Sequence, residues 1–199
     1  MAISTQQLDS SKASYTEIIP VQDIKDPLEI YDKRKLALKL SVLPDYVRNA
    51  VIHQTADSEY NPMYDKILLD KWGRKASDSN LYVENPAMVF YRAALNVADG
   101  LMKNDPSLDY ESTVKKMFEK FVNRELFPNT PYMSNSGHRL IVNYYKNKLT
   151  TLTQNRNYTS IDDLLNDLDS ERTQKSQLFA CFVFEIYDNL DSIFNTMHI

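Results

Sequence analysis

Apolar and polar residues follow a helical repeat in the first part of the chain. Between residues 28 and 56 the apolar side chains recur at the spacing of one helix face. Pro44 is placed to begin a second helix, because proline is favoured in a first helical turn. A shorter apolar stretch, Tyr64 to Leu69, precedes the turn-like residues 71–74. The repeat predicts two helices, with apolar positions Leu36, Leu40, Leu43, Val47, Ala50 and Val51.

The clearest helix pattern begins at Asn85. Asparagine is a favoured N-cap, Pro86 suits the first turn, and residues 104–106 should end the helix. A further helix is expected from about Asp109 to Glu125. Because both helices carry an apolar stripe, we expect them to pack as a pair. The two stripes are Phe90, Ala94, Val97, Ala98 and Leu101, and Val114, Met117, Phe118, Phe121 and Val122.

The segment from Phe127 to Arg139 interrupts this pattern. It holds two prolines and a glycine among small polar residues. Proline removes a backbone donor and disrupts helix interiors and central strands, so we expect an ordered or exposed loop and no regular helix. One interpretation of Thr130 and Asn135 is therefore that they are ordinary turn residues.

A continuous apolar run from Leu178 to Phe184 is typical of a strand buried on both faces. After it, Asp188 is placed to cap a last helix. We find no second convincing strand in the sequence, and a buried strand without a neighbour would leave its backbone groups unpaired. The sheet that contains this strand is therefore expected to be completed by other polypeptide.

Length and composition narrow the class of protein. A chain of 199 residues can form one domain with a substantial core, and no apolar run approaches the ~18 residues that a membrane span needs. Residues 1–27 are polar and contain two prolines, which predicts a flexible arm without the features of a secretory signal. We therefore expect a cytoplasmic protein that does not bind membranes.

Charge and rare residues exclude several functions. A formal net charge of -4 argues against a broad surface for DNA or RNA. Three glycines are too few for a Gly-rich dinucleotide or phosphate loop. One cysteine allows no internal disulfide, and the histidines have no metal-ligand spacing, so no metal site is expected.

Two segments together resemble the large subunit of ribonucleotide reductase. Residues 127–137, Phe-Pro-Asn-Thr-Pro-Tyr-Met-Ser-Asn-Ser-Gly, are similar to the family's P-N-S-P-T-L-M-N-A-G loop. Residues 180–183, Ala-Cys-Phe-Val, followed by 188–194, Asp-Asn-Leu-Asp-Ser-Ile-Phe, are similar to A-C-F-V-L-P-x-x-D-S-M-x-S-I-F. The stretch 64–101 looks like the helical lead-in to the first loop. The Pro-Asn-Thr-Pro spelling and the phenylalanine after the cysteine look closest to the adenosylcobalamin-dependent class.

This resemblance implies a mainly α fold: an N-terminal helical region, then the first strand and following helix of a ten-stranded α/β barrel that is otherwise missing. The expected domains are a flexible arm at 1–27, a helical domain at 28–126 and the start of the barrel domain at 127–199. The last comprises a substrate loop at 127–139, a helical insertion at about 141–175, and the first strand and helix at 177–199. The insertion departs from the family, which joins the loop to the strand by a few residues.

The resemblance also implies roles for single residues. Cys181 would be one of the cysteine pair that supplies reducing electrons, although an inert buried thiol is the alternative. Asp188 would hold a dNTP or ATP allosteric effector, and its plain alternative is an N-cap. A hydroxyl and free amides suit a substrate phosphate without a fixed positive charge. Substrate contacts are implied for Thr130, Pro131, Asn135 and Ala180.

By resemblance, the chain would take part in reducing ribonucleotides to deoxyribonucleotides by thiyl-radical chemistry. It would be inactive without a C-terminal portion, which would carry the other cysteines and bind most of the adenosylcobalamin. Other expected partners are the ribonucleotide substrate, a thioredoxin-like or other dithiol reductant, and a second copy that binds through the C-terminal helix. The alternative is a non-catalytic helical binding or assembly module derived from the same region.

Overall fold

The computed structural model describes residues 24, 28–53, 62–76, 78–154, 178, 189 and 190. Within these ranges the chain is helical, as predicted, and the only β-type pairing is in isolated bridges, Tyr31 with Tyr82 and Lys75 with Tyr82. In chain order the helices are α1 (Lys33–Ser41), α2 (Asp45–His53), α3 (Pro62–Trp72), α4 (Pro86–Asn104), α5 (Tyr110–Val122), α6 (Thr130–Asn135) and α7 (His138–Gln154).

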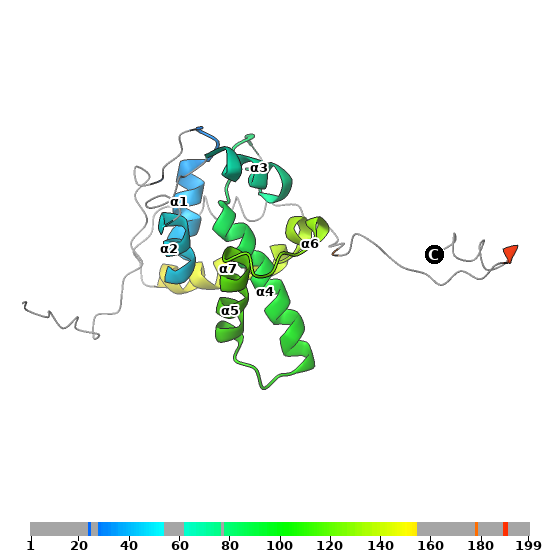
Figure 1. Cartoon of the computed structure of the whole chain (residues 1–199). Coiled ribbons are helices and arrows are strands. Elements are labelled where there is room, and N and C mark those ends of the chain that lie inside the picture. Colours follow the sequence, from blue (N-terminus) through cyan, green and yellow to red (C-terminus); the bar gives the residue numbers. More distant parts are fainter. Residues whose placement is uncertain are drawn as a thin grey trace, which may run out of the picture.

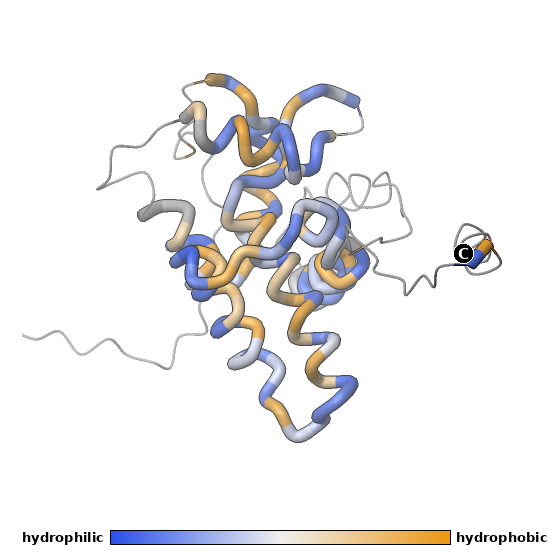
Figure 2. Tube along the Cα trace, turned by 45° about the vertical axis from the view of Figure 1, so that its right-hand side comes forward, coloured by the Kyte–Doolittle hydropathy of each residue, from blue (hydrophilic) through white to orange (hydrophobic). Residues whose placement is uncertain are grey.

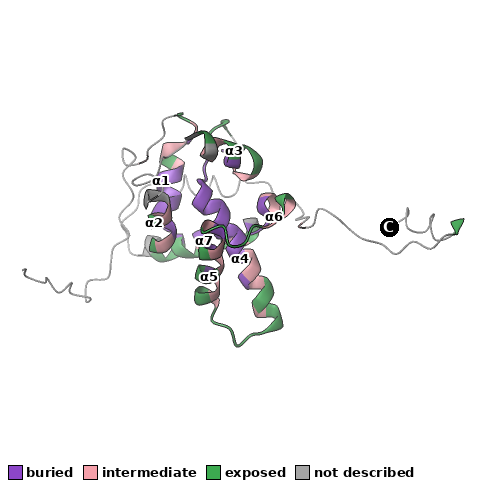
Figure 3. Ribbon diagram, viewed as in Figure 1, coloured by how far each residue is buried: buried purple, intermediate pink, exposed green. Residues whose placement is uncertain are grey.

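Helix α4 lies at the centre of the described residues and contacts five other helices (Figure 1). Its most extensive partner is α5, and α2, α3, α6 and α7 also pack against it. The first half of α4 is buried and its last turns, towards the α4–α5 connection, are exposed (Figure 3). The core therefore surrounds the N-terminal half of this helix.

Both predicted ends of α4 and the predicted start of α5 are confirmed, whereas α5 ends at Val122, three residues before the expected Glu125. The Asn85 side chain accepts a hydrogen bond from the Met88 amide at 3.0 Å, and Asp105 follows the last turn. Asp109 caps α5 in the same way through the Ser112 amide. Hydrophobic and hydrophilic residues alternate along both helices (Figure 2). The buried members of the predicted stripes are Phe90, Ala94, Ala98, Val114, Phe118 and Phe121.

Two predictions about the helices were wrong. Residues 130–135 form helix α6 where an irregular loop was expected, because Pro131 falls in the first turn, where its missing amide costs nothing. Helix α3 runs to Trp72, so the first residues of the expected turn at 71–74 belong to a helix. The two helices expected between 28 and 56 are confirmed as α1 and α2.

Helix α7 begins at His138, directly after Gly137, and Met133, Ile141, Tyr145 and Leu149 share the core with α4. The predicted arm, strand and last helix fall mostly or wholly outside the described residues.

Candidate functional site

Helix α6 carries three of the residues for which the resemblance to ribonucleotide reductase implies substrate contacts. Asn129 caps it, since its side chain accepts a hydrogen bond from the Tyr132 amide at 2.9 Å. Thr130 is exposed, and Pro131 and Asn135 are half-buried. The structure therefore brings these three together on one short helix, which packs against α3 and α4.

The N-terminal half of α6 is attached to α4 through one phenol. The Tyr132 hydroxyl accepts a hydrogen bond from the Asn96 amide group at 3.1 Å and lies 3.4 Å from the Ala93 carbonyl oxygen. Burial raises the pKa of Tyr132, so the phenol stays neutral at physiological pH. This attachment uses neutral groups only.

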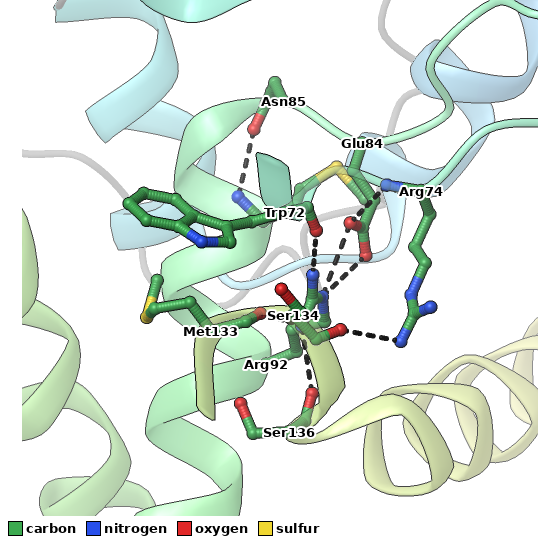
Figure 4. A network of polar contacts seen from close by, with 9 residues as sticks. Trp72, Arg74, Glu84, Asn85, Arg92, Met133, Ser134 and Ser136 are labelled. Carbon is green, nitrogen blue, oxygen red and sulfur yellow. Dashed lines mark hydrogen bonds and ion pairs between the residues drawn. The ribbon is translucent and has the colours of Figure 1, made fainter. Parts of the chain in front are cut away.

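The C-terminal half of α6 is attached through a buried cation. Arg92, on α4, is fully buried, and its Nη1 donates to the Met133 carbonyl at 2.7 Å and the Ser136 carbonyl at 3.0 Å (Figure 4). Its Nη2 donates to the carbonyl of Trp72 at the end of α3. One guanidinium thus joins α3, α4 and α6.

Glu84 balances this charge. Its carboxylate lies 3.1 Å from Arg92 Nε, and its side chain is only 6% exposed. The second carboxylate oxygen accepts the Arg74 amide at 3.0 Å, and the Arg74 guanidinium reaches the Ser134 carbonyl at 3.1 Å (Figure 4). Removing one member of such a buried pair costs far more than the pair contributes net, because the other charge is left unpaired.

Gly137 allows α4 and the end of α6 to approach closely. Its φ of +70° lies in the left-handed region, and a Cβ atom there would sit 1.8 Å from the Arg92 carbonyl oxygen. No side chain fits at that distance. The carbonyl of Gly137 then accepts the Ile141 amide at 2.8 Å, which starts α7. The glycine of the family-like loop therefore fixes the α6–α7 junction against α4.

Phe127 packs on aromatic rings from the end of α3 and from α4. Phe127 is 53% exposed, and its ring centroid lies 5.4 Å from that of Trp72 and 6.4 Å from that of Phe90. An exposed apolar side chain therefore lies three residues before the start of α6.

The other predicted site residues, Ala180, Cys181 and Asp188, lie outside the described residues. Sequence reasoning missed Arg92, Glu84 and Arg74. A signal was present: Arg92 interrupts a run of apolar residues on α4, and a charge at such a position needs a partner. The partners, however, are mostly backbone carbonyls, which a sequence pattern does not reveal.

Thr130 has an exposed hydroxyl, while the charges of Arg92 and Glu84 are used internally. Within the described part of the chain, no three His, Cys, Asp or Glu side chains could hold a metal ion. None of the described helices is long and apolar enough to cross a bilayer.

Comparison with known families adds one match. Residues 58–140 are similar to the family described as "Ribonucleotide reductase, all-alpha domain". The match runs from before α3 to the first turn of α7, so it includes α4, α5, α6, Gly137 and the Arg92–Glu84 pair. No curated protein and no solved structure matches the chain. This similarity supports a relation to the N-terminal region of the reductase large subunit.

Proposed function

We propose that this chain is the N-terminal part of a ribonucleotide reductase catalytic subunit, inactive until a C-terminal part completes the barrel. The observation that carries the proposal is the family match over residues 58–140, which includes the loop-like segment 127–137 and helix α6 within it. The helical architecture of the matched stretch agrees with an all-α domain.

In this proposal α6 contacts the ribonucleotide. Thr130 and the turn at Pro131 face the phosphates or ribose with a hydroxyl and backbone groups, and Asn135 adds an amide. Ala180 and Cys181 lie on the first barrel strand, where the Cys181 thiol supplies reducing electrons to the substrate. Asp188 binds the sugar of a dNTP or ATP effector, and the helix that follows joins two copies in a dimer.

The remaining chemistry belongs to the C-terminal part. That part contributes the radical cysteine, the second reducing cysteine and most of the site for adenosylcobalamin, which supplies the radical when bound. A thioredoxin-like protein or another dithiol re-reduces the cysteine pair. The described residues contribute binding and placement: a buried anchor on α4 and an exposed hydroxyl on α6.

Reconstitution tests this proposal. The 199-residue chain is co-expressed with a reductase polypeptide that begins after the equivalent of Ile199, and deoxyribonucleotide formation is measured. We expect turnover only when both parts are present. Cys181→Ser should abolish multiple turnover with a dithiol reductant and leave substrate affinity unchanged.

Two results would contradict the proposal in different ways. Undiminished turnover of the Cys181→Ser complex would remove Cys181 from the reductant role. A stable complex that binds no ribonucleotide and forms no product would favour the alternative of a non-catalytic binding or assembly module.

A further inference from the structure

Arg92 holds the backbone on both sides of Asn135. Its Nη1 donates to the Met133 carbonyl, two residues before Asn135, and to the Ser136 carbonyl, one residue after it, at 2.7 and 3.0 Å. Asn135 itself is the last residue of α6 and is half-buried. The two bonds therefore bracket one of the three predicted substrate contacts on this helix.

The anchor that supplies these bonds is itself fixed. Glu84 binds Arg92 Nε, and the Trp72 carbonyl accepts from Nη2, so the guanidinium is oriented by groups from two other segments (Figure 4). The Arg92 backbone lies in the buried half of α4 and touches Gly137 so closely that no Cβ fits between them. A planar fork with several donors suits this geometry, whereas a lysine ammonium is a single point charge on a flexible stem.

The other end of α6 has a different attachment. Thr130 lies two residues before Tyr132, whose hydroxyl bonds to Asn96 and lies near the Ala93 carbonyl. Arg92, in contrast, bonds to the Met133 and Ser136 carbonyls. The two predicted contacts at opposite ends of the helix are thus placed by two separable sets of bonds.

We propose that Arg92 is a positioning residue for Asn135. By holding the Met133 and Ser136 carbonyls, it sets the backbone from which the Asn135 amide reaches the ribonucleotide, while Tyr132 sets the end that carries Thr130. Arg92 does not touch substrate, since it is fully buried and bonded internally. The role in substrate binding rests on the proposed function, whereas the role of Arg92 in positioning α6 rests on the geometry alone.

Amide hydrogen exchange of the full chain tests the placement. Arg92→Lys keeps the positive charge beside Glu84 but loses the guanidinium hydrogen bonds to the Met133 and Ser136 carbonyls. The backbone amides of residues 135–137 should therefore exchange about tenfold faster. Amides in the middle of α5 should be unchanged. Tyr132→Phe is the matched control, because it removes the other attachment and should leave exchange at Ser136 and Gly137 unaltered. A uniform rise across α4 and α5 in Arg92→Lys would overturn the proposal.

Glu84→Gln keeps the test decisive if Arg92→Lys does not fold. It preserves the shape of the carboxylate but removes the charge that orients Arg92, so faster exchange should again be confined to residues 135–137. An unchanged pattern in that variant would overturn the proposal.

A double-mutant cycle in the reconstituted enzyme tests the link to substrate. Asn135→Ala and Arg92→Lys should each raise KM for the ribonucleotide by about tenfold and leave kcat nearly unchanged. If Arg92 acts through Asn135, the double variant should show no further rise. Additive effects would mean that Arg92 acts by a different route and would overturn the proposal. If the wild-type complex shows no turnover, the proposed function fails and the exchange experiment alone decides the placement.

Discussion

The two sides of α4 are held by different forces. On one side α5 packs through fully buried apolar residues, with Val114, Phe118 and Phe121 at most 2% exposed. On the other side α6 contributes one buried apolar side chain, Met133, and is fixed mainly by Arg92 bonded to backbone carbonyls. The α4–α5 pair is an apolar interface, and the α4–α6 contact is a polar one.

The difference teaches what each contact can do. Apolar burial is non-directional and roughly proportional to the area removed from water, so it stabilises a helix pair without requiring particular donor and acceptor positions. Buried hydrogen bonds are costly when incomplete and depend strongly on geometry. A hydrogen-bonded contact therefore suits α6, the helix that is proposed to face the substrate.

The largest effect is expected at Gly137. Gly137→Ala places a Cβ atom 1.8 Å from the Arg92 carbonyl oxygen at a φ of +70°, so α6 and α7 would have to move away from α4. We expect the free energy of unfolding to fall by more than about 4 kcal/mol, or folding to fail, as measured by chemical denaturation.

Gly100 provides the control. It lies in the exposed half of α4 with nothing within 4 Å of an added Cβ, so Gly100→Ala should stabilise the protein by about 0.5–1 kcal/mol. Equal effects of the two substitutions would show that the close approach of α4 to Gly137 is not formed in solution.

Removing the buried cation should have the next largest effect. Arg92→Met leaves Glu84 buried without its partner, and we expect a loss of about 3–5 kcal/mol in the free energy of unfolding. The double variant Arg92→Met with Glu84→Leu should recover part of that loss. On the apolar side, Phe118→Leu should cost less than about 1.5 kcal/mol. A loss for Arg92→Met no larger than that of Phe118→Leu would contradict the polar account of α6.

Alkaline pH should destabilise the fold in part through Tyr144, on helix α7, which packs against α4. Burial, aided by the nearby Glu111 carboxylate, raises the pKa of Tyr144 to about 12 from an ordinary value of 10.0. Its ring packs on Tyr91 with centroids 5.9 Å apart. The folded protein therefore keeps a proton that the unfolded chain releases. The contribution of Tyr144 to the free energy of unfolding is fully present below pH 10 and is lost as the pH rises towards about 12.

Tyr144→Phe sharpens this test. The variant loses the bond from the Tyr144 hydroxyl to the Val42 carbonyl, but its stability should fall less steeply between pH 10 and about 12 than that of the wild type. Urea denaturation across that range measures the slope. The same slope in both proteins would mean that Tyr144 is not buried as a neutral phenol.

The smallest predicted effect concerns the cap of α6. Asn129→Ala removes the acceptor for the Tyr132 amide and should cost about 1 kcal/mol. Because α6 is also held by Arg92 and Tyr132, the loss should appear as faster amide exchange in its first turn, with little change in the unfolding midpoint. A collapse of the whole domain would show that the cap, and not Arg92, is the main attachment.

The apolar interface between α4 and α5 could be predicted from the sequence. Asn85, Pro86 and Asp109 are capping signals that act within one turn, and the stripes on α4 and α5 have a helical period, so local chemistry determines both helices. The mainly α character was implied by the family resemblance and agrees with these local helix signals.

The polar contact between α4 and α6 could be predicted only in part. The sequence placed Thr130, Pro131 and Asn135 near one another, but two prolines and a glycine were read as excluding a helix, and Pro131 in fact begins one. Arg92 reaches carbonyls 41 and 44 residues away, and no local pattern records such partners. The need for glycine at Gly137 likewise depends on the approach of another helix.

The central claim is that α6 and Cys181 face the same substrate once the C-terminal part is bound, despite the intervening residues 138–180. Cys181 is the sole cysteine of the chain, so Thr130→Cys, at an exposed position on α6, creates one defined pair when the cysteines of the C-terminal part are replaced by serine. A short bismaleimide should cross-link Cys181 to residue 130 efficiently in the reconstituted complex, and added ribonucleotide should suppress the reaction. The claim would be contradicted if no cross-link formed although a monofunctional maleimide modified each of the two thiols.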